Sequence, residues 1–272
     1  MKRRNVSISK TVLWRTGWAL TVLLVFPGSV FCEPTPSAVA SFDSYIQALE
    51  KRLDRQHHSS DGIAAVDEAD ARRRLRRGES IIEQLTPDSG EELSRALLHH
   101  WRGTAFVAGA KASDVERLLR DFESYPHHYR PEVLRGKVLS GQGDNLVGLM
   151  RVRQHHVLTV VMDTTYDIAF GRLDPQHGYS ISRSTRISEI DSPGTSKERA
   201  LGAAQEHGFL WRLNTYWSYV ERDGGLYMQI ESVSLTRSIP PGLGWALRPF
   251  VESVPRESLE FTLRSTCNAL RK

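Results

Sequence analysis

The sequence contains little cysteine and none of the short motifs that mark common enzymes. Its two cysteines, Cys32 and Cys267, are too few for a fold held by several disulfides or for a cysteine-based metal site. There is no HExxH metal motif, no GxSxG around a serine, and no GxGxxG or GxxxxGKS/T phosphate loop. We therefore expect no metal, no cofactor and no recognisable catalytic residue.

Length and composition set the next limits. Hydrophobic residues make up 40% of the 272 residues and charged residues 25%, close to the averages of globular proteins. This composition argues against a disordered chain, a collagen-like repeat and a polytopic membrane protein. The length suits one large domain, or one domain with an appendage.

The first residues have the pattern of a targeting segment. Five basic residues and no acidic one precede the apolar run Trp18–Phe26, which is followed by Pro27. This pattern predicts a signal peptide over residues 1–32, removed near Cys32 or, by a second small-residue pattern, after Ala40. An uncleaved N-terminal membrane anchor is the alternative, because the apolar stretch is about long enough to span a bilayer. We therefore expect an exported protein, periplasmic or secreted.

The basic character of the chain belongs to that segment. The formal net charge is +4 and the isoelectric point is about 9.1. Residues 1–32 hold five of the 36 basic residues and none of the 32 acidic ones, so the remainder has 31 basic against 32 acidic residues. A nearly neutral remainder gives no reason to expect nucleic-acid binding.

Residues 33–94 are expected to form a helical extension and a first strand. Apolar side chains recur at spacings of three and four from Phe42 to Leu53, which is typical of an amphipathic helix that ends near residues 57–62. Residues 61–78 indicate a solvated helix or loop, in which nearby acids neutralise the arginines at 72–77. Two strands are expected within 79–87 and 93–109, on either side of a Gly-containing turn.

Residues 114–125, DVERLLRDFESY, form the clearest helix of the sequence because they carry a continuous apolar stripe. Ser113 is expected to cap its N-terminus, with Glu116 completing a capping box. Pro126 and Pro131 then break the chain.

The remainder predicts an antiparallel sheet followed by one long helix. From residue 132 to 189 polarity alternates with a period of two, with turns at 141–145, 174–178 and 192–196. A further hairpin spans 208–238, and no helix separates these strands, so they should be antiparallel. Three-and-four spacing from Leu247 to Leu270 predicts the final helix, which Pro255 either kinks or begins. Cys267 on this helix is expected to be a small buried thiol.

This order of elements resembles the START-like superfamily, also called SRPBCC or helix-grip. GTAFVAGAKASDVERLLRDFESYPHHYRPEV, residues 103–133, is similar to the family's strand, small-residue helix entry and aromatic and proline break. SLTRSIPPGLGWALRPFVESVPRESLEFTLRSTCNAL, residues 234–270, is similar to its last strand and gripping helix. The resemblance covers residues 95–272 and implies an α+β fold, in which a curved antiparallel sheet grips a long C-terminal helix around a largely apolar cavity.

Members of that superfamily use the cavity for sterols, phospholipids, quinones, aromatic polyketides or plant hormones. The resemblance therefore implies a START-like ligand-binding domain at 95–272. Residues 41–94 have no counterpart in the minimal fold. Whether their helix packs on the sheet, covers the cavity mouth or spaces the domain from a membrane stays open.

The aromatic hairpin supplies the candidate ligand site. Alternation places an apolar set on one face: Phe209, Trp211, Leu213, Trp217 and Tyr219. It places a polar set, which can orient a headgroup, on the other: Arg212, Asn214, Tyr216 and Ser218. With two residues of the last helix, the predicted ligand-binding residues are Trp211, Leu213, Trp217, Tyr216, Arg212, Asn214, Phe250 and Val254.

Other sets of residues give weaker indications of a metal site or an enzyme. Histidine pairs at 57–58, 99–100, 127–128 and 155–156 invite a metal site, but neighbours on a strand point to opposite faces. Ser184, His207 and Asp223 can be assembled on paper into a hydrolase triad without any motif around the serine. For a cyclase-like enzyme, the candidate polar strand residues are Arg183, Arg186, Glu189, Tyr216 and Glu231.

Three functions follow from these features. We favour an exported protein that binds or transfers a hydrophobic small molecule or lipid, with a membrane surface as a further contact. A polyketide cyclase or aromatase acting in the same cavity is the first alternative. The second is an envelope module in which residues 41–94 dock a partner. The oligomeric state is not fixed by the sequence.

Overall fold

The structure is a computed structural model that describes residues 33–58, 63, 68–86, 91–155, 159–238 and 244–271. The side chains of residues 91–92 and 244–252 are outside the description. The predicted signal segment at 1–32 also lies outside it, so its export role stays a prediction.

One antiparallel sheet of ten strands dominates the fold, in the order β1-β3-β10-β9-β7-β6-β5-β4, with β2 added beside β3 and β8 beside β7. The expected antiparallel sheet is therefore confirmed. The strands are β1 (Ile81–Gln84), β2 (Glu91–Leu93), β3 (Ala96–Ala108), β4 (Val133–Gln142), β5 (Asn145–His155), β6 (Thr159–Asp174), β7 (His177–Asp191), β8 (Arg199–Ala200), β9 (Arg212–Arg222) and β10 (Gly225–Arg237).

The hairpin of β9 and β10 forms as predicted and lies at the centre of the sheet. Its tight turn places Asp223 and Gly224 at φ values of 57° and 75°. A turn with two positive φ values has the twist that antiparallel strands require. Tyr227 Oη donates a hydrogen bond to Asp223 Oδ2 at 2.9 Å, which fixes the turn residue in place.

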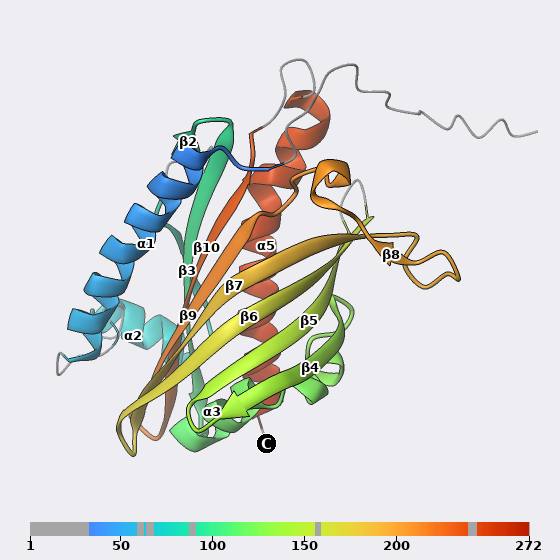
Figure 1. The fold of residues 1–272 in the computed structure, drawn as a ribbon. Coiled ribbons are helices and arrows are strands. Elements are labelled where there is room, and N and C mark those ends of the chain that lie inside the picture. The colour runs from blue at the N-terminus through green and yellow to red at the C-terminus, as the bar shows by residue number, and fades with distance from the viewer. Residues whose placement is uncertain are drawn as a thin grey trace, which may run out of the picture. The chain divides into compact units, whose positions relative to one another are not determined.

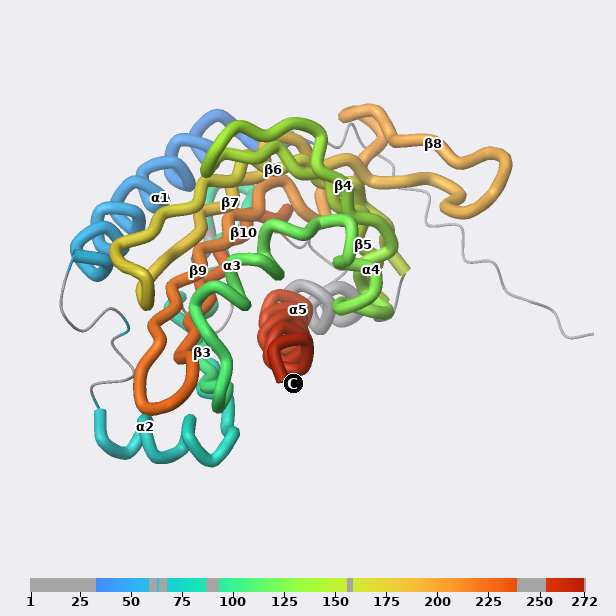
Figure 2. Tube along the Cα trace, turned by 90° about the horizontal axis from the view of Figure 1, so that it is seen from below, coloured from blue at the N-terminus to red at the C-terminus, as the bar shows by residue number. Residues whose placement is uncertain are grey.

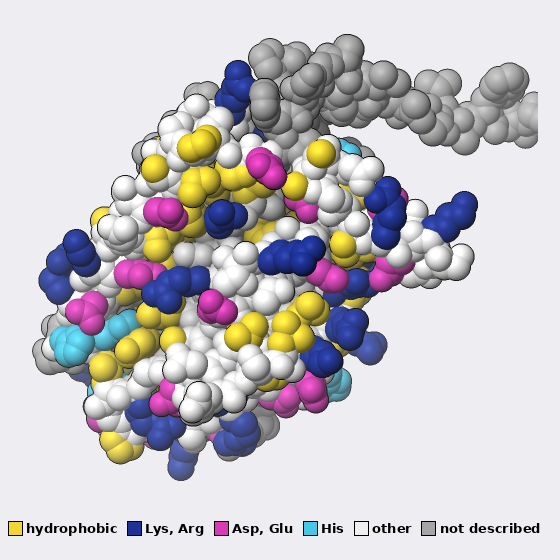
Figure 3. Space-filling view, viewed as in Figure 1, with side chains coloured by type: hydrophobic (Ala, Val, Ile, Leu, Met, Phe, Trp, Pro, Cys, Tyr) yellow, Lys and Arg dark blue, Asp and Glu magenta, His cyan; other side chains and the backbone are white. Residues whose placement is uncertain are grey.

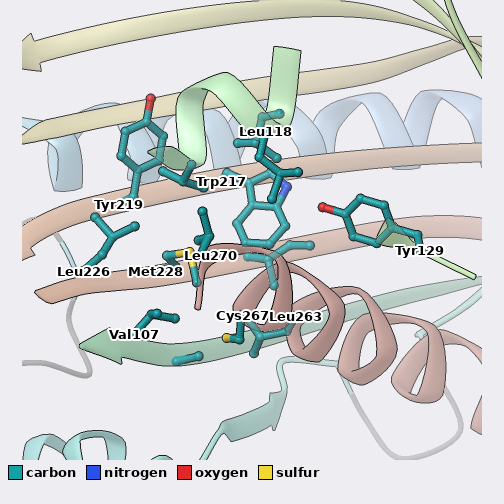
Figure 4. Packing of buried hydrophobic residues seen from close by; sticks show 14 of the residues in the cluster. Val107, Leu118, Tyr129, Trp217, Tyr219, Leu226, Met228, Leu263, Cys267 and Leu270 are labelled. Atoms are coloured by element: carbon teal, nitrogen blue, oxygen red, sulfur yellow. The ribbon is translucent and has the colours of Figure 1, made fainter. Parts of the chain in front are cut away.

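Helix α5 (Gly244–Leu270) lies in the hollow of the curved sheet, as Figures 1 and 2 show. We call the side of the sheet that faces α5 the gripped face. Leu259, Leu263 and Cys267 of α5 are buried in the largest hydrophobic cluster, together with Trp217 and Met228 of the sheet. Figure 4 shows several of these side chains packed around the C-terminal half of the helix.

Four details concern the expectations for α5 and its contact with the sheet. Pro255 lies well inside the helix, so it does not mark the beginning. Gly103 of β3 permits the close approach of the helix, because a Cβ there would lie 2.7 Å from Leu259 Cδ2. Cys267 is buried as expected, and burial raises the pKa of its thiol to about 11. The side chain of Phe250, a predicted ligand contact, lies outside the described residues.

Helix α1 (Pro36–His57) packs on the opposite side of the sheet, which we call the outer face (Figure 2). The predicted amphipathic stripe is confirmed, since the buried side chains of α1 are Ala38, Phe42, Ile46, Leu49 and Leu53. They pack against residues of β3, β9 and β10 such as Leu98, Tyr216 and Val233. Of the three placements left open by the sequence, the helix takes the one against the sheet.

Short helices complete the described fold: α2 (Ala69–Arg76), α3 (Ala112–Arg120), a 3-10 turn η2 (Phe122–Ser124), α4 (Tyr125–His128) and a 3-10 turn η3 (Ala203–Gln205). Within the described residues, no helix combines the length and the apolar character needed to cross a bilayer.

The expected cap of α3 is wrong. Lys111, not Ser113, is the N-cap, and the side chain of Asp114 accepts a hydrogen bond from the Lys111 backbone N–H at 3.2 Å. The helix thus starts earlier than the sequence pattern indicated, because the shorter acid at the third helical position reaches the cap. Glu116 instead pairs with Arg120 at 3.1 Å and also with Arg172.

Candidate functional site

The gripped face changes character along the strands. Towards the β9–β10 turn it carries bulky apolar side chains, among them Trp217, Tyr219 and Met228, which pack with α5. One step further along, the register aligns Ser182, Thr215 and Ser232 directly opposite one another on β7, β9 and β10. Residues directly opposite in an antiparallel pair share a face, so these three form a hydroxyl row across the gripped face.

The hydroxyl row is half-buried although it lies on central strands. On the outer face the same strands are closed by buried residues under α1, such as Tyr216 and Val233. The accessible surface of Ser182, Thr215 and Ser232 therefore lies on the side of α5. At the hydroxyl row, three short side chains on adjacent strands of the sheet stand where bulky residues such as Trp217 stand nearer the β9–β10 turn.

Buried polar atoms without a partner accompany this row. Trp101 lies opposite Ser232, and His99 lies opposite Ser234 one level further along β3. Among the described residues, Trp101 Nε1, His99 Nε2 and Thr236 Oγ1 are buried and have no hydrogen-bond partner. Buried polar groups are normally hydrogen-bonded, so a group of three at adjacent levels of one face requires an explanation.

Charge is scarce on this face. From the hydroxyl row to the level of Thr236, the described residues on the gripped face of β3, β10, β9, β7 and β6 include no lysine or arginine. Arg172, also on this face, lies towards α3 and pairs with Glu116. His99 is 1% exposed, and burial lowers the pKa of its imidazole to about 4, so it is neutral at ordinary pH. The arrangement can donate and accept hydrogen bonds, but it offers no counter-ion to a charged group.

Glu189, near the end of β7, is a buried carboxylate on this face, and it holds the segment that precedes β9. It accepts hydrogen bonds from the backbone N–H groups of His207 at 3.0 Å, Gly208 at 3.1 Å and Phe209 at 3.3 Å. His207 Nδ1 lies 2.7 Å from its other oxygen, and this bond raises the pKa of the imidazole. Phe209 is thereby held in a cluster with Val254 of α5.

A second carboxyl lies at the margin between β4 and α5. Glu132 is half-buried, and burial raises its pKa to about 7, while Gln154 Nε2 donates to it at 3.2 Å. The charges of Glu257 and Arg264 on α5 act on it in opposite directions. The sequence pattern gave no signal for this residue, because its burial depends on the docked helix.

The predicted ligand-binding residues divide between the two faces. Leu213 and Trp217 lie on the gripped face, and Val254 joins the cluster with Phe209. Trp211 and Tyr216 instead lie in the cluster beneath α1. The expectation that Trp211 and Trp217 share a face is therefore wrong.

The register gives the reason for this difference. Arg212 is paired with Leu235, and the backbone N–H of Trp211 also donates to the Leu235 carbonyl, at 2.8 Å. Two consecutive residues thus oppose one, as in a β-bulge, and the alternation is interrupted. Arg212 and Asn214 lie opposite Leu235 and Val233 of the outer face, so the predicted polar set faces away from α5.

The outer face is polar and paired. Glu231, whose side chain is fully buried, accepts from Arg52 of α1, from Gln229 Nε2 at 3.1 Å, and lies 2.7 Å from His100 Nε2. Tyr45 of α1 contacts the other nitrogen of that imidazole at 2.8 Å. Burial alone would raise the pKa of Glu231, but the hydrogen bonds and positive charge around it outweigh burial and lower it.

A second group on the same face joins α1 to β7 and β9. Glu50 accepts from Arg183 Nε at 2.7 Å and from Tyr216 Oη at 3.0 Å. Figure 3 shows the molecule from the outer side, where basic and acidic side chains alternate without a large patch of one sign. Arg183, Tyr216 and Glu231, proposed for a cyclase-like site, thus serve to attach α1 and do not face the gripped helix.

The structure does not bring together the residues of the hydrolase triad or of a metal site that the sequence suggested. Ser184 accepts from the Leu213 N–H at 2.8 Å, His207 binds Glu189, and Asp223 binds Tyr227. Among the described residues no group of three or more histidine, cysteine, aspartate or glutamate side chains is placed to hold a metal ion.

Comparisons with known proteins are limited to fold. No protein-family model and no curated protein matches the chain. A STAR-related lipid transfer protein from Xanthomonas axonopodis is similar, with 16% identity and a TM-score of 0.44 over 70% of this chain and 99% of that one. The aromatase/cyclase Zhui from a Streptomyces species has 16% identity and a TM-score of 0.44 over 63% and 92%.

A START superfamily protein from Mycobacterium smegmatis has 15% identity and a TM-score of 0.41, over 63% of this chain and 96% of that one. Scores of this size leave the fold assignment to rest on the strand order and on the position of the last helix. Both have the expected form: consecutive antiparallel strands curve around a C-terminal helix that follows the final strand. The chain therefore has a START-like, helix-grip fold.

Proposed function

We propose that this protein is exported and binds or carries a hydrophobic small molecule or lipid between the gripped face and α5. The observation that carries the proposal is the hydroxyl row of Ser182, Thr215 and Ser232, which is accessible in the middle of the sheet and on the side of the helix. The neighbouring wall of Leu213 and Trp217 is apolar.

The energetics favour an apolar ligand at such a place. Burial of apolar surface contributes roughly 25 cal/mol per Å², before the cost of ordering the ligand. A few polar groups then fix the orientation of the ligand without dominating its affinity. The described gripped face has this composition, with apolar walls and a small number of hydroxyl and ring nitrogen groups.

The cyclase-like alternative is weakened by the geometry. Three of the residues put forward for it, Arg183, Tyr216 and Glu231, are bonded to α1 or lie under it. Glu189 is engaged by the segment before β9. No observation on the described residues favours turnover over binding.

Native mass spectrometry of the protein, purified without detergent and followed by organic extraction, tests the proposal. We expect a stoichiometric hydrophobic adduct in the wild type. Thr215→Phe should remove it, because a phenyl ring placed in the hydroxyl row occupies the accessible space. Thr165→Phe, on the outer face of β6, is the matched control and should retain the adduct.

An empty wild type that also takes up no lipid, sterol or quinone from a panel would contradict the proposal and favour the partner-docking alternative. Export is tested separately by the N-terminal sequence of the protein recovered from the envelope or medium of the expressing cell. A chain beginning near residue 33 is expected, whereas an intact N-terminus would indicate a retained anchor.

A further inference from the structure

The most informative unexplained groups are the polar atoms at one end of the gripped face. Trp101 Nε1 and His99 Nε2 lie two residues apart on β3 and therefore on the same side of the strand. That this side is the gripped one follows from their neighbours, since Leu98 and His100 face α1. Both atoms are buried, and His99 is 1% exposed.

From these atoms the geometry points to a subsite that binds an oxygen atom of an uncharged hydrophobic ligand through Trp101 and His99. This inference rests on the proposed function, and it names the chemical class of the ligand. An indole N–H can only donate, so the ligand atom opposite Trp101 must be an acceptor. A neutral imidazole nitrogen can donate or accept, so a hydroxyl or a carbonyl oxygen satisfies the pair.

The surroundings extend the same chemistry. Ser232 lies opposite Trp101, Ser234 lies opposite His99, and Thr236 at the next level is the third unpartnered group. Side chains directly opposite on paired strands lie about 5 Å apart, within reach of one bound headgroup. Hydroxyl groups of this kind can bind one or two further oxygen atoms of the same ligand.

The described residues at this end of the gripped face offer no counter-ion to an ionic headgroup. From the hydroxyl row to the level of Thr236, the described strand residues on the gripped face include no lysine or arginine, and Arg172 at the α3 end pairs with Glu116. Glu189 would repel an anion, and it is already engaged by four hydrogen bonds. Burying a carboxylate or phosphate without a counter-ion is costly, so alcohols, sterols, quinones and acylglycerols are favoured over fatty acids and phosphates.

The test compares ligands that differ only in the headgroup. Four probes are delivered from cyclodextrin at pH 8: 1-tetradecanol, tetradecanoate, tetradecyl phosphate and tetradecane. The bound fraction of each is measured by native mass spectrometry. We expect 1-tetradecanol to bind about tenfold more tightly than tetradecane, because the alcohol oxygen satisfies buried groups that the alkane leaves unpaired. The two anions should bind more weakly than the alcohol.

Trp101→Phe keeps an aromatic ring and removes the indole donor. This substitution should weaken the binding of 1-tetradecanol about threefold to tenfold. It should change the affinity for tetradecane by no more than about twofold, since only the alcohol uses the donor. Trp211→Phe is the matched control, because Trp211 lies beneath α1, and it should change neither. His99→Leu provides a second variant with the same expected loss of preference for the alcohol.

The outcomes separate the inference from the function on which it rests. If none of the four probes binds, the subsite is wrong, and the proposed function fails as well if the wild type also takes up no lipid, sterol or quinone from the panel. If the probes bind but Trp101→Phe weakens alcohol and alkane equally, the protein is a carrier and the subsite is wrong. Tighter binding of tetradecyl phosphate than of 1-tetradecanol would likewise overturn the assignment to an uncharged ligand.

Discussion

The two faces of one sheet treat polar groups in opposite ways. Under α1, the buried carboxylate of Glu231 is surrounded by Arg52, His100 and Gln229, and each bond links the sheet to itself or to the helix. Facing α5, Trp101 and His99 present buried nitrogen atoms without a partner among the described residues. The outer face uses polar groups to attach a helix, whereas the gripped face keeps them available.

This contrast has two exceptions on the outer face. Thr104 Oγ1 and Gln229 Oε1 are buried and unpartnered among the described residues. They lie directly opposite each other on β3 and β10, one level from the paired carboxylate, and the amide nitrogen of Gln229 donates to Glu231. Neither lies beside accessible space of the kind found at the hydroxyl row.

The strongest way to break the comparison is to replace one tryptophan on each face. Trp211→Ala and Trp217→Ala should each lower the free energy of unfolding by about 3–5 kcal/mol, because both remove a large buried ring. Only Trp217→Ala should also reduce the hydrophobic adduct, because only Trp217 faces α5. Urea unfolding and native mass spectrometry measure the two effects, and loss of the adduct in Trp211→Ala alone would reverse our assignment of the faces.

A second substitution tests whether the outer network attaches α1. Glu231→Ala leaves Arg52 and His100 without their buried partner, so we expect a loss of about 3–5 kcal/mol in urea unfolding. Glu83→Ala, which breaks the more exposed pair with Arg102, is the control and should cost at most about 1 kcal/mol. Equal effects of the two substitutions would show that burial of the network adds nothing.

The smallest effect expected is a pH dependence that belongs to the gripped face. The pKa of His99 is about 4 in the folded protein, below the ordinary value of 6.5. Its contribution to stability is therefore complete above pH 6.5 and is lost as the pH falls towards 4, because the unfolded chain binds the proton more readily. The loss amounts to about 3 kcal/mol at most.

Urea unfolding of the wild type and of His99→Leu, at intervals between pH 7 and 4, measures the contribution of His99 to the free energy of unfolding. The variant should lose less stability over that range than the wild type, since leucine does not titrate. Parallel curves for the two proteins would mean that His99 is solvated in the native state and would remove the basis for treating it as a neutral ligand group.

The success of the sequence pattern differs between these regions. The amphipathic stripe from Phe42 to Leu53 correctly predicted a helix with one buried side, because helical periodicity is a local property. The period-two alternation likewise predicted the hairpins. Neither pattern could indicate Trp101 and His99 as a pair of buried polar groups without partners, since that depends on what the neighbouring strands and helix supply.

The error at Trp211 shows where alternation stops being reliable. A strand pattern assigns faces by counting residues, and a single bulge opposite Leu235 shifts the count by one. The signal that was available lies elsewhere, in the serines and threonines at every second position of 180–184 and 232–236. That spacing placed small polar side chains on one face of β7 and β10, the two strands that flank β9.

The sequence by itself determined the antiparallel strands, the last helix and the amphipathic helix before them, because hydrophobic periodicity and turn residues act over short distances. Only the tertiary structure decided which side of the sheet each helix covers, which carboxylates are paired, and where buried polar atoms are left without partners. Those properties arise from contacts between residues far apart in the chain, such as Arg52 with Glu231. Local sequence patterns cannot predict such contacts.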